Sequence, residues 1–316
     1  MDLSIIIVNW NSARYVENCL RALYRNAVGM DFETIVVDNG SFDSCQKMIA
    51  DKFPGVRFLQ SERNLGFAQA NNFGARMAHG EFLLFLNPDT EIIGNAVKGM
   101  LLAIKGLPRA GILGCKLLNT DMTYQTSCRQ PFPTILNQVF DSDILHRLLP
   151  DHSPRKAALL SKAANLLEVQ VISGACMMIR KTVFEEVGGF SSEYFMYTED
   201  VDLCFKVRRA GYANYYLGDV SIVHHGGGSS NQRKENSYGN VQMRESIFKF
   251  LKKTRGESYA YLYKLAMLLN GVMRFCIILP AALPNAFTGR FSRSRASLLK
   301  WTSIIRWTLG IEKWAR

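Results

Sequence analysis

Leu3-Ser-Ile-Ile-Ile-Val8, near the start of the chain, is the stretch that decides the fold class. All but one of its residues are apolar and most are β-branched, so it predicts a strand that is buried on both faces. Strands of this kind belong to sheets that helices cover on both sides. The sequence therefore predicts an α/β protein.

Three similar segments follow within the next eighty residues. They are Thr34–Asp38, Val56–Leu59 and Glu81–Leu86. Helical patterns separate them, one after Ser12 and one from Phe67 to His79. Strands that alternate with helices predict a Rossmann-like, mostly parallel sheet with right-handed crossovers.

Three polar residues, namely Asn9, Asp38 and Asp89, fall at the ends of expected strands. The carboxyl ends of parallel strands meet at one edge of a sheet, and ligands bind there in open α/β folds. We therefore expect these side chains on a single rim. No GxGxxG follows the first strand and no Walker motif occurs, which argues against dinucleotide and P-loop chemistry.

The composition fits one large α/β domain, or one domain with an appendage, since the chain has 316 residues and 48% of them are hydrophobic. Its seven cysteines are scattered and form no CxxC pair, so neither a disulfide framework nor a zinc site is expected. The first residues have no basic segment before the apolar run, and we expect no signal peptide. Reduced thiols in the cytoplasm are the simplest interpretation.

The net charge of +11 is confined to the C-terminal part of the chain. Residues 249–316 contain 13 Lys and Arg and two acids, which gives 13 − 2 = +11, so the other residues are neutral in sum. Residues 262–289 are apolar, but Lys264, Arg274, Pro280 and Pro284 interrupt them. We therefore favour a segment that lies in the membrane plane or is re-entrant over a spanning helix, which needs about 20 apolar residues.

A basic amphipathic helix is expected after this segment. Leu298, Trp301, Ile305 and Leu309 share one helical face, and Lys300 lies on the other. Such a helix suits an anionic membrane surface, and the alternative is docking on the catalytic domain or on a partner subunit. No nucleic-acid-reading motif accompanies the charge, so nucleic-acid binding is not expected.

Two strand-end turns could bind a nucleotide. Asp38 and Asn39 lie in VVDNGSFD (36–43), where a carboxylate could accept the ring N–H of a pyrimidine; the alternative is an Asx-turn. Arg63-Asn64-Leu-Gly66 precedes a helix, and an Arg with helix N–H groups suits a diphosphate; the alternative is ordinary capping.

Two further turns could bind a divalent cation. Asn87-Pro-Asp89 ends the fourth strand and could supply oxygen ligands, although such turns are also common without a metal. His224-His225 is followed by three glycines, and an imidazole suits Mn²⁺, whereas a structural histidine is the alternative. Which of the two histidines would be the ligand stays open.

Three acids open a helix in Glu199-Asp200-Val-Asp202, after the aromatic run Tyr194–Tyr197. Acids in a first turn favourably interact with the helix dipole, which is one explanation for them. Three acids in four residues exceed that need. One of them, with a raised pKa, could take a proton from a sugar hydroxyl.

Seven motifs occur in the order seen in family 2 glycosyltransferases. They are SIIIVNWNS, VVDNGSFD, RNLGFAQANNFG, FLLFLNPDT, ISGACMMIRKTVFEEVGGF, YTEDVDLCFKVRRAGY and VHHGGGSS. Over residues 3–255 the chain resembles this family, and most closely its bacterial rhamnosyltransferase-like branch. The resemblance implies a GT-A fold with a nucleotide-sugar-binding half (1–95) and an acceptor-binding, catalytic half (96–245), followed by a helical membrane-association region (246–316).

The resemblance also implies roles for individual residues. Asp200 would be the catalytic base, and Asp89 with His224 would bind Mg²⁺ or Mn²⁺. The residues implied on the donor side are Asn9, Asp38, Asn39, Arg63, Asn64, Gly66, Asn87 and Asp89. Those implied on the acceptor side are Gly174 and Glu199. Two departures are present: Asn87 replaces the first acid of the DxD motif, and Ser191-Ser192 replaces the usual Asp-Glu.

The implied activity is an inverting, metal-dependent sugar transfer from a nucleotide-diphosphate sugar to a polyprenyl-linked glycan acceptor. We expect it at the cytoplasmic face of the plasma membrane, in assembly of cell-surface polysaccharide. The resemblance favours dTDP-rhamnose as donor, with UDP-hexose or UDP-N-acetylhexosamine as alternatives. A non-catalytic membrane-associated adaptor is a further alternative, and a homo-oligomer stays open.

Overall fold

The computed structural model describes residues 1–139, 165–226, 237–282 and 291–312. The chain divides into two compact units. The first comprises Met1–Phe132 and Lys162–Ser230, and the second comprises Pro133–Ser161 and Asn231–Arg316.

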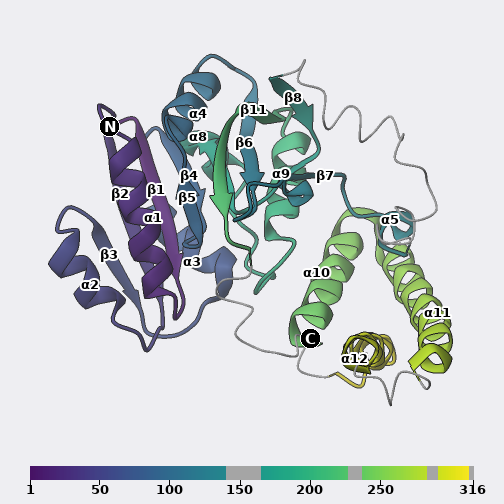
Figure 1. Ribbon diagram of the computed structural model, residues 1–316. Helices are drawn as coiled ribbons and strands as arrows, with labels where there is room; N and C mark the ends of the chain where they lie inside the picture. The colour runs from purple at the N-terminus through teal and green to yellow at the C-terminus, as the bar shows by residue number, and fades with distance from the viewer. Residues whose placement is uncertain (140–164, 227–236, 283–290, 313–316) are drawn as a thin grey trace. The chain divides into compact units, whose positions relative to one another are not determined.

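A nine-stranded sheet forms the centre of the first unit, as Figure 1 shows. Its strand order is β3-β2-β1-β4-β10-β6-β11-β5, and β8 pairs with β11. The strands are β1 (Leu3–Asn9), β2 (Phe32–Asn39), β3 (Arg57–Ser61), β4 (Phe82–Leu86), β5 (Thr90–Ile92), β6 (Ala110–Leu118), β8 (Leu166–Val169), β10 (Cys176–Arg180) and β11 (Ala213–His224). A separate two-stranded sheet joins β7 (Arg129–Gln130) to β9 (Val171–Ile172).

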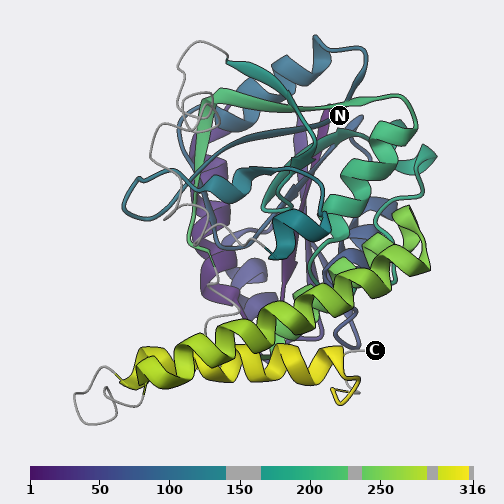
Figure 2. The same cartoon turned by 90° about the vertical axis from the view of Figure 1, so that its right-hand side faces the viewer.

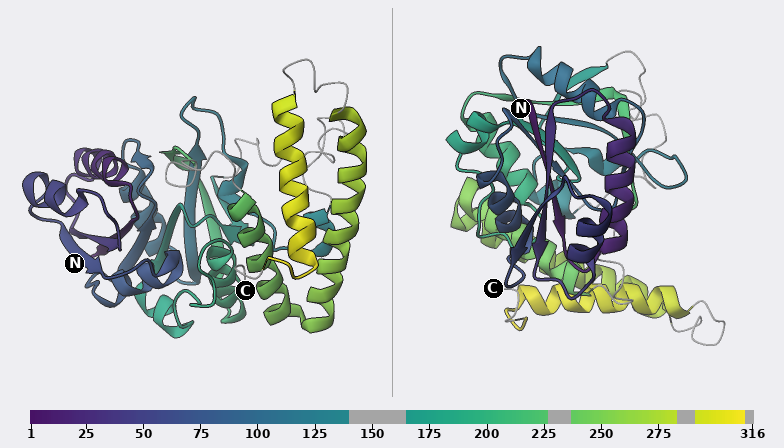
Figure 3. Two further views of the ribbon diagram at one scale, coloured as in Figure 1. Left: turned by 90° about the horizontal axis from the view of Figure 1, so that it is seen from below. Right: turned by 90° about the vertical axis from the view of Figure 1, so that its left-hand side faces the viewer.

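Helices flank this sheet on both sides, which confirms the predicted α/β class (Figures 1 and 3). They are α1 (Ala13–Asn26), α2 (Cys45–Lys52), α3 (Gly66–Arg76), α4 (Ala96–Lys105), α8 (Lys181–Glu186) and α9 (Glu199–Arg209), with the 3₁₀ turn η1 (Thr126–Cys128). Every residue of β1 is buried, as expected for a continuous apolar run. Along α1 the expected face, Val16, Leu20 and Leu23, is buried.

The sheet is parallel only in part. The four strands read from the N-terminal sequence, in the order β3-β2-β1-β4, are all parallel. The next strand, β10, is antiparallel to both of its neighbours, and β11 is antiparallel to β5 and β8. Because β10 runs the other way, it starts at the rim where β4 ends, with Cys176 opposite Leu86.

The sequence pattern predicts no strand at β5, β6 or β10. In β6, Gly111 and Gly114 weaken the strand pattern, and their role appears only in the tertiary structure. A Cβ atom on Gly114 would lie 2.3 Å from the side chain of Ile172, and one on Gly111 would lie 2.0 Å from that of Val207. These glycines let β9 and α9 pack closely on the sheet.

The second unit is helical where the structure describes it. Its helices are α5 (Ile135–Val139), α10 (Ser237–Arg255), α11 (Glu257–Ala282) and α12 (Phe291–Thr308). α11 and α12 lie side by side, as Figures 2 and 3 show. Tyr263 and Met267 of α11 are fully buried, and the indole N–H of Trp307 donates a 2.7 Å hydrogen bond to Glu245 of α10.

α11 is longer and more continuous than the sequence suggested. It runs through Lys264, Arg274 and Pro280 without a break. Residues Glu257–Pro280 are long and apolar enough to cross a membrane, with a mean hydropathy of 1.6 in the most apolar window. The interruptions seen in the sequence therefore do not end the helix. Pro284, the last of them, lies outside the described residues.

α12 buries a face that differs from the predicted stripe. Trp301, Ile304 and Trp307 are buried, whereas Leu309 is 58% exposed. The buried face includes Ile304 and Trp307, which are three residues apart and face α10 and α11. The apolar face of α12 thus serves packing within the second unit.

Candidate active site

Two polar side chains, Asn9 and Asp38, stand at the carboxyl ends of β1 and β2. In the register of these strands, Asn9 lies opposite Asp38. The Asn9 amide donates to Oδ2 of Asp38 at 2.7 Å, and the Ser41 N–H and the Gln60 amide donate to its Oδ1 at 2.8 and 2.9 Å. Both residues are buried. These donors fix the orientation of the Asp38 carboxylate at the rim.

Asn39, the last residue of β2, organises the loop that leads into α3. The side chain of Asn39 donates to Oδ1 of Asn64 at 3.0 Å and accepts from the N–H of Leu65 at 2.8 Å. Oδ1 of Asn64 also accepts from the N–H of Gly66 at 2.9 Å. Arg63, the residue before this pair, has an exposed side chain. Asn39, Asn64 and Gly66 thus lie together, with Arg63 beside them.

Gly66 brings this donor-side loop against the aromatic segment before α9. Its φ is +78°, and an added Cβ atom would lie 2.4 Å from the carbonyl oxygen of Phe195. The N–H of Phe67 donates to that same oxygen at 2.9 Å. Tyr197 and Thr198 both have φ of 70°, a costly conformation for residues with side chains. The segment that carries Glu199 and Asp200 is therefore held in a strained backbone by contact with the α3 loop.

Asp89 and His224 come together where β4 and β11 end. His224 Nε2 lies 3.4 Å from Oδ1 of Asp89 and 3.5 Å from the amide nitrogen of Asn87. His224 Nδ1 lies 3.0 Å from Oε1 of Gln125, whose amide donates to the His224 carbonyl at 2.7 Å. This pairing places the proton on Nδ1 and leaves the lone pair of Nε2 directed at Asp89 and Asn87.

Asn87 adds an unused acceptor to this group. Its Oδ1 is buried and has no hydrogen-bond partner among the residues that the structure describes. A buried amide oxygen without a donor is costly, so its presence calls for an explanation. A carboxylate, an amide oxygen and an imidazole nitrogen form a set that suits Mn²⁺ or Mg²⁺. His225, by contrast, points its ring to Glu91 at 2.8 Å.

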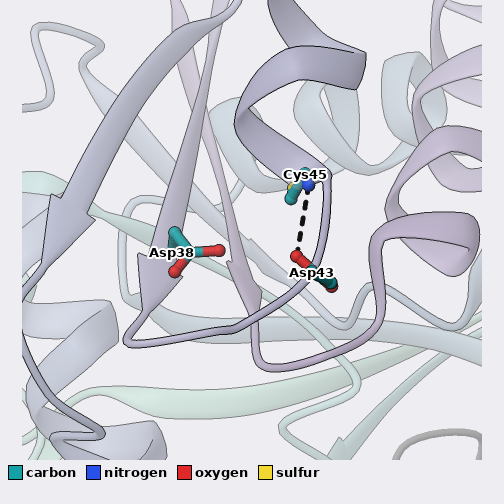
Figure 4. A group of neighbouring side chains, drawn as sticks. All are labelled: Asp38, Asp43 and Cys45. Atoms are coloured by element: carbon teal, nitrogen blue, oxygen red, sulfur yellow. Dashed lines mark hydrogen bonds between the residues drawn. The ribbon is translucent and has the colours of Figure 1, made fainter.

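A second group of side chains has the spacing of a metal site, but its carboxylates already accept hydrogen bonds. Asp38, Asp43 and Cys45 place one ligand atom each within 4.8 Å of one another (Figure 4). The amide of Asn9 already donates to both carboxylates, at 2.7 Å and 3.2 Å. Burial, followed by the charges of Asp43 and Asp38, raises the pKa of the Cys45 thiol to about 12. The group is therefore better explained as a hydrogen-bonded turn that holds Asp38.

Asp200 stands in the first turn of α9, and Glu199 precedes it. Oδ2 of Asp200 accepts from the N–H of Gly174 at 2.9 Å, and its Oδ1 accepts from the N–H of Val201 at 2.8 Å. Burial raises the pKa of Asp200, and these two N–H groups partly oppose that effect. Burial and then the charge of Asp200 raise the pKa of Glu199 to about 8. Oε2 of Glu199 is buried without a hydrogen-bond partner.

The third acid of this turn has a structural role. Asp202 is fully buried, accepts from the hydroxyl of Ser191 at 2.6 Å and lies 3.7 Å from the Lys206 ammonium. Ser191, a departure from the family pattern, thus supplies a partner to Asp202. Only Glu199 and Asp200 of the three acids stay available for chemistry.

The loop between β9 and β10 connects the two halves of the site. The carbonyl of Ala175 accepts from the N–H of Asn87 at 3.0 Å, and the neighbouring Gly174 contacts Asp200. Asn9 on β1 lies between Asp38 on β2 and the end of β4. The structure thus brings Asp38, Asp89 with His224, and Asp200 to one rim. Gln125 was missed because it lies in a segment without periodicity, and nothing in the sequence links it to His224.

Comparison with known proteins yields family matches over most of the chain. A family model described as glycosyl transferase family 2 matches residues 4–188, and one described as glycosyl transferase family group 2 matches residues 157–289. N-acetylglucosaminyl-diphospho-decaprenol L-rhamnosyltransferase of Mycobacterium tuberculosis is 28% identical over 239 residues, which cover 71% of this chain and 76% of the relative. Rhamnosyltransferase WbbL of Escherichia coli K12 is 27% identical over 246 residues, covering 70% and 82%.

Solved structures show the same fold. The mannosyltransferase PcManGT of Pyrobaculum calidifontis, in complex with GDP-Man and Mn²⁺, has a TM-score of 0.59 at 18% identity and covers 98% of this chain and 86% of its own. GalNAc-T7, with UDP, GalNAc and Mn²⁺, has a TM-score of 0.53 at 15% identity, covering 71% of this chain and 44% of its own. At these identities the likeness shows the fold alone.

Proposed function

Because the chain belongs to glycosyltransferase family 2, we propose that it is an inverting transferase that moves a sugar from a nucleoside-diphosphate donor to a lipid-linked glycan. One observation carries the proposal. A partly buried carboxylate with a raised pKa, Asp200, stands on the same rim as the Asp89–His224 pair and is connected to it through Gly174 and Ala175. This arrangement supplies a base on one side and a site for a diphosphate on the other.

The proposed reaction is a single displacement. Asp200 takes the proton of the acceptor hydroxyl, and the resulting oxygen attacks the anomeric carbon as its bond to the diphosphate breaks. The raised pKa makes the carboxylate a better proton acceptor than an exposed aspartate. The N–H groups of Gly174 and Val201 hold it in place. Attack from the side opposite the leaving group inverts the anomeric configuration.

We further propose that Asp89, His224 and the amide oxygen of Asn87 hold a divalent cation, Mn²⁺ or Mg²⁺. The orphaned Oδ1 of Asn87 and the free lone pair of His224 Nε2 fit such an ion. When bound, the ion offsets the negative charge that develops on the leaving diphosphate. Asn87 in place of an acid makes the site less negative, so we expect weaker binding than at a site with two carboxylates.

The preferred donor is dTDP-rhamnose, to be tested against UDP-hexoses and UDP-N-acetylhexosamines. Two similar proteins carry rhamnosyltransferase names, and one of those names specifies a diphospho-decaprenol acceptor. On this chain, the donor side would comprise Asn9, Asp38, Asn39, Arg63, Asn64 and Gly66. Gly174 and Glu199 would contact the acceptor.

Membrane association through the second unit completes the proposal. The two cations within the apolar run of α11 turn toward other helices: Lys264 lies 4.9 Å from the ring centre of Phe248 and 5.0 Å from that of Trp307, and Arg274 lies 4.7 Å from that of Trp301. The opposite side of α11 is therefore apolar and exposed, with Leu262, Leu265, Leu269 and Ile277 on it. This face and the basic charge of the unit suit the anionic cytoplasmic surface of a membrane.

Thermal shift with a panel of nucleotide sugars, each with Mn²⁺, Mg²⁺ or EDTA, tests donor choice directly. We expect dTDP-rhamnose with a metal to raise the melting temperature most. Transfer to a diphosphate-linked N-acetylglucosamine lipid, with the product anomer determined by NMR, tests the reaction. A product that retains the donor configuration, or a panel without any metal-dependent stabilisation, would contradict the proposal.

A further inference from the structure

Arg129 carries a charge that the described protein does not balance. It lies on β7 and is half-buried, with its guanidinium 4.7 Å from the ring centre of Tyr216. Its Nε is buried and has no hydrogen-bond acceptor. Within the described ranges, no carboxylate forms an ion pair with it. A half-buried guanidinium without a counter-charge is unfavourable, since it loses hydration without gaining a full partner.

The groups around Arg129 in the described part of the chain are neutral. The hydroxyl of Tyr124 and the thiol of Cys128 lie 2.8 Å apart beside it. Burial raises the pKa of Tyr124, Cys128 and Tyr216, so all three keep their protons at neutral pH. The contact with the Tyr216 ring offsets only part of the free-energy cost of desolvating the Arg129 guanidinium. The environment of Arg129 thus offers shape and hydrogen-bonding groups but no negative charge.

Arg180, on β10 of the nine-stranded sheet, is an arginine with a structural role and serves for comparison. Its guanidinium lies 4.6 Å from the ring centre of Phe82, almost the same packing as Arg129 on Tyr216. Arg180, however, forms an ion pair with Glu81, at the end of the sheet away from the rim. The two arginines differ in that Arg180 has a carboxylate partner, whereas Arg129 has none within the described ranges. The missing counter-charge of Arg129 therefore points to a ligand.

Arg129 lies close to both parts of the site. It is opposite Ile172 in the β7–β9 pair, and the carbonyl of Cys128 accepts from the N–H of Ser173 at 3.2 Å. The next residue, Gly174, holds Asp200. In the other direction along the chain, Gln125 holds His224. The segment 125–129 thus joins the proposed base to the proposed metal ligands.

We propose that Arg129 forms an oxyanion subsite that binds a diphosphate next to Asp200. The inference rests on the proposed function for the identity of the ligand. A planar guanidinium can bind two oxygens of a phosphate at once, which a lysine cannot do. The diphosphate could belong to the nucleotide donor or to the lipid-linked acceptor, and the subsite has the same chemistry in either case.

Calorimetry with inorganic pyrophosphate in EDTA tests the subsite without requiring transfer activity. We expect saturable binding to the full-length protein, roughly ten- to hundredfold weaker binding to Arg129→Met, and an intermediate affinity for Arg129→Lys. Arg180→Met is the matched control and should bind pyrophosphate like the unaltered protein. Thermal unfolding of each variant reports whether it is folded, and Arg129→Lys keeps the charge and stem if Arg129→Met does not fold.

Equal affinities of Arg129→Met and the unaltered protein would overturn the proposal, and so would the absence of saturable binding to the unaltered protein. Two further measurements identify the source of the diphosphate. If it is the acceptor's, Arg129→Met raises the KM for a diphosphate-linked glycolipid but not for the same glycan on a neutral alkyl chain. If it is the donor's, the variant raises the Kd of the free nucleoside diphosphate. Arg129-dependent pyrophosphate binding without sugar transfer would uphold the subsite and contradict the proposed function.

Discussion

The backbone N–H of Gly174 donates a 2.9 Å hydrogen bond to Oδ2 of Asp200. This bond joins the loop before β10 to the first turn of α9, two segments that are 26 residues apart in the sequence. A Cβ atom on Gly174 would lie 3.3 Å from that of Asp200, so the glycine permits the close approach. The carboxylate is thereby fixed in position while burial raises its pKa.

Asp200→Asn should lose most of the turnover while the donor still binds. An amide cannot accept the proton of the acceptor hydroxyl, and general-base help is worth ~10²–10⁴-fold. Steady-state rates and the Kd of the donor measure the two effects separately. Asp202→Asn is the matched control: it should lower the melting temperature, because Ser191 and Lys206 lose a charged partner, yet keep turnover in the folded protein. A near-normal rate for Asp200→Asn would refute the assignment of the base.

Glu199 should make the protein less stable as the pH rises. Its folded-state pKa is about 8 against an ordinary value of 4.5, so between these pH values the folded state binds more protons than the unfolded state. The stabilisation is complete below pH 4.5 and is lost as the pH rises to about 8, with a size on the order of a few kcal/mol. Urea denaturation from pH 5 to 9 should therefore give a steeper decline for the unaltered protein than for Glu199→Gln. Parallel curves would contradict the burial of an ionisable Glu199.

The parts of the fold that the sequence predicts are those with a local signal. The strands β1, β2 and β4 contain continuous apolar runs that end in polar turns, and this pattern identifies both the strand and the rim residue at its end. β6 lacks such a pattern because Gly111 and Gly114 are required by contacts with α9 and β9, which are distant in sequence. A propensity argument cannot anticipate a glycine that is needed only for packing.

The same distinction applies to the site. Asp38, Asp89 and Asp200 lie at strand or helix ends that the sequence pattern locates. Gln125, in contrast, reaches His224 across 99 residues of sequence from a segment without periodicity. In α11, Lys264 reads as an interruption of the apolar run, yet the structure turns it toward Phe248. Long-range partners of this kind are set by the tertiary fold and leave no mark in a single sequence.

Gly66→Ala should destabilise the protein more than Gly29→Ala does. Both glycines have positive φ, +78° and +74°, so both variants incur the left-handed strain of about 1–2 kcal/mol. Only at Gly66 does the new Cβ meet other atoms, the Phe195 carbonyl at 2.4 Å, whereas nothing lies within 4 Å at Gly29. The difference between the two free energies of unfolding, expected at about 1 kcal/mol or more, measures the contact with the segment before α9. Equal losses would show that this contact is easily relaxed.

His224→Ala should abolish the stabilisation that Mn²⁺ gives to the nucleotide complex, and His225→Ala should not. The Nε2 atom of His224 points to Asp89 at 3.4 Å, whereas His225 is engaged by Glu91 at 2.8 Å. Thermal shifts with nucleoside diphosphate, in Mn²⁺ and in EDTA, compare the two variants directly. If His225→Ala lost the metal response and His224→Ala kept it, the assignment of the ligand between the two histidines would have to be reversed.

Aspartate substitutions on the exposed face of α11 should weaken binding to anionic vesicles. Leu265 and Leu269 are 52% and 62% exposed on the face opposite Lys264, so a charge there adds little strain to the folded protein but is costly to insert among acyl chains. Cosedimentation of Leu265→Asp and Leu269→Asp with phosphatidylglycerol vesicles provides the measurement. Leu102→Asp, at a leucine of α4 that is equally exposed at 62%, is the matched control and should pellet like the unaltered protein. Unchanged pelleting of both α11 variants would mean that this face does not contact lipid.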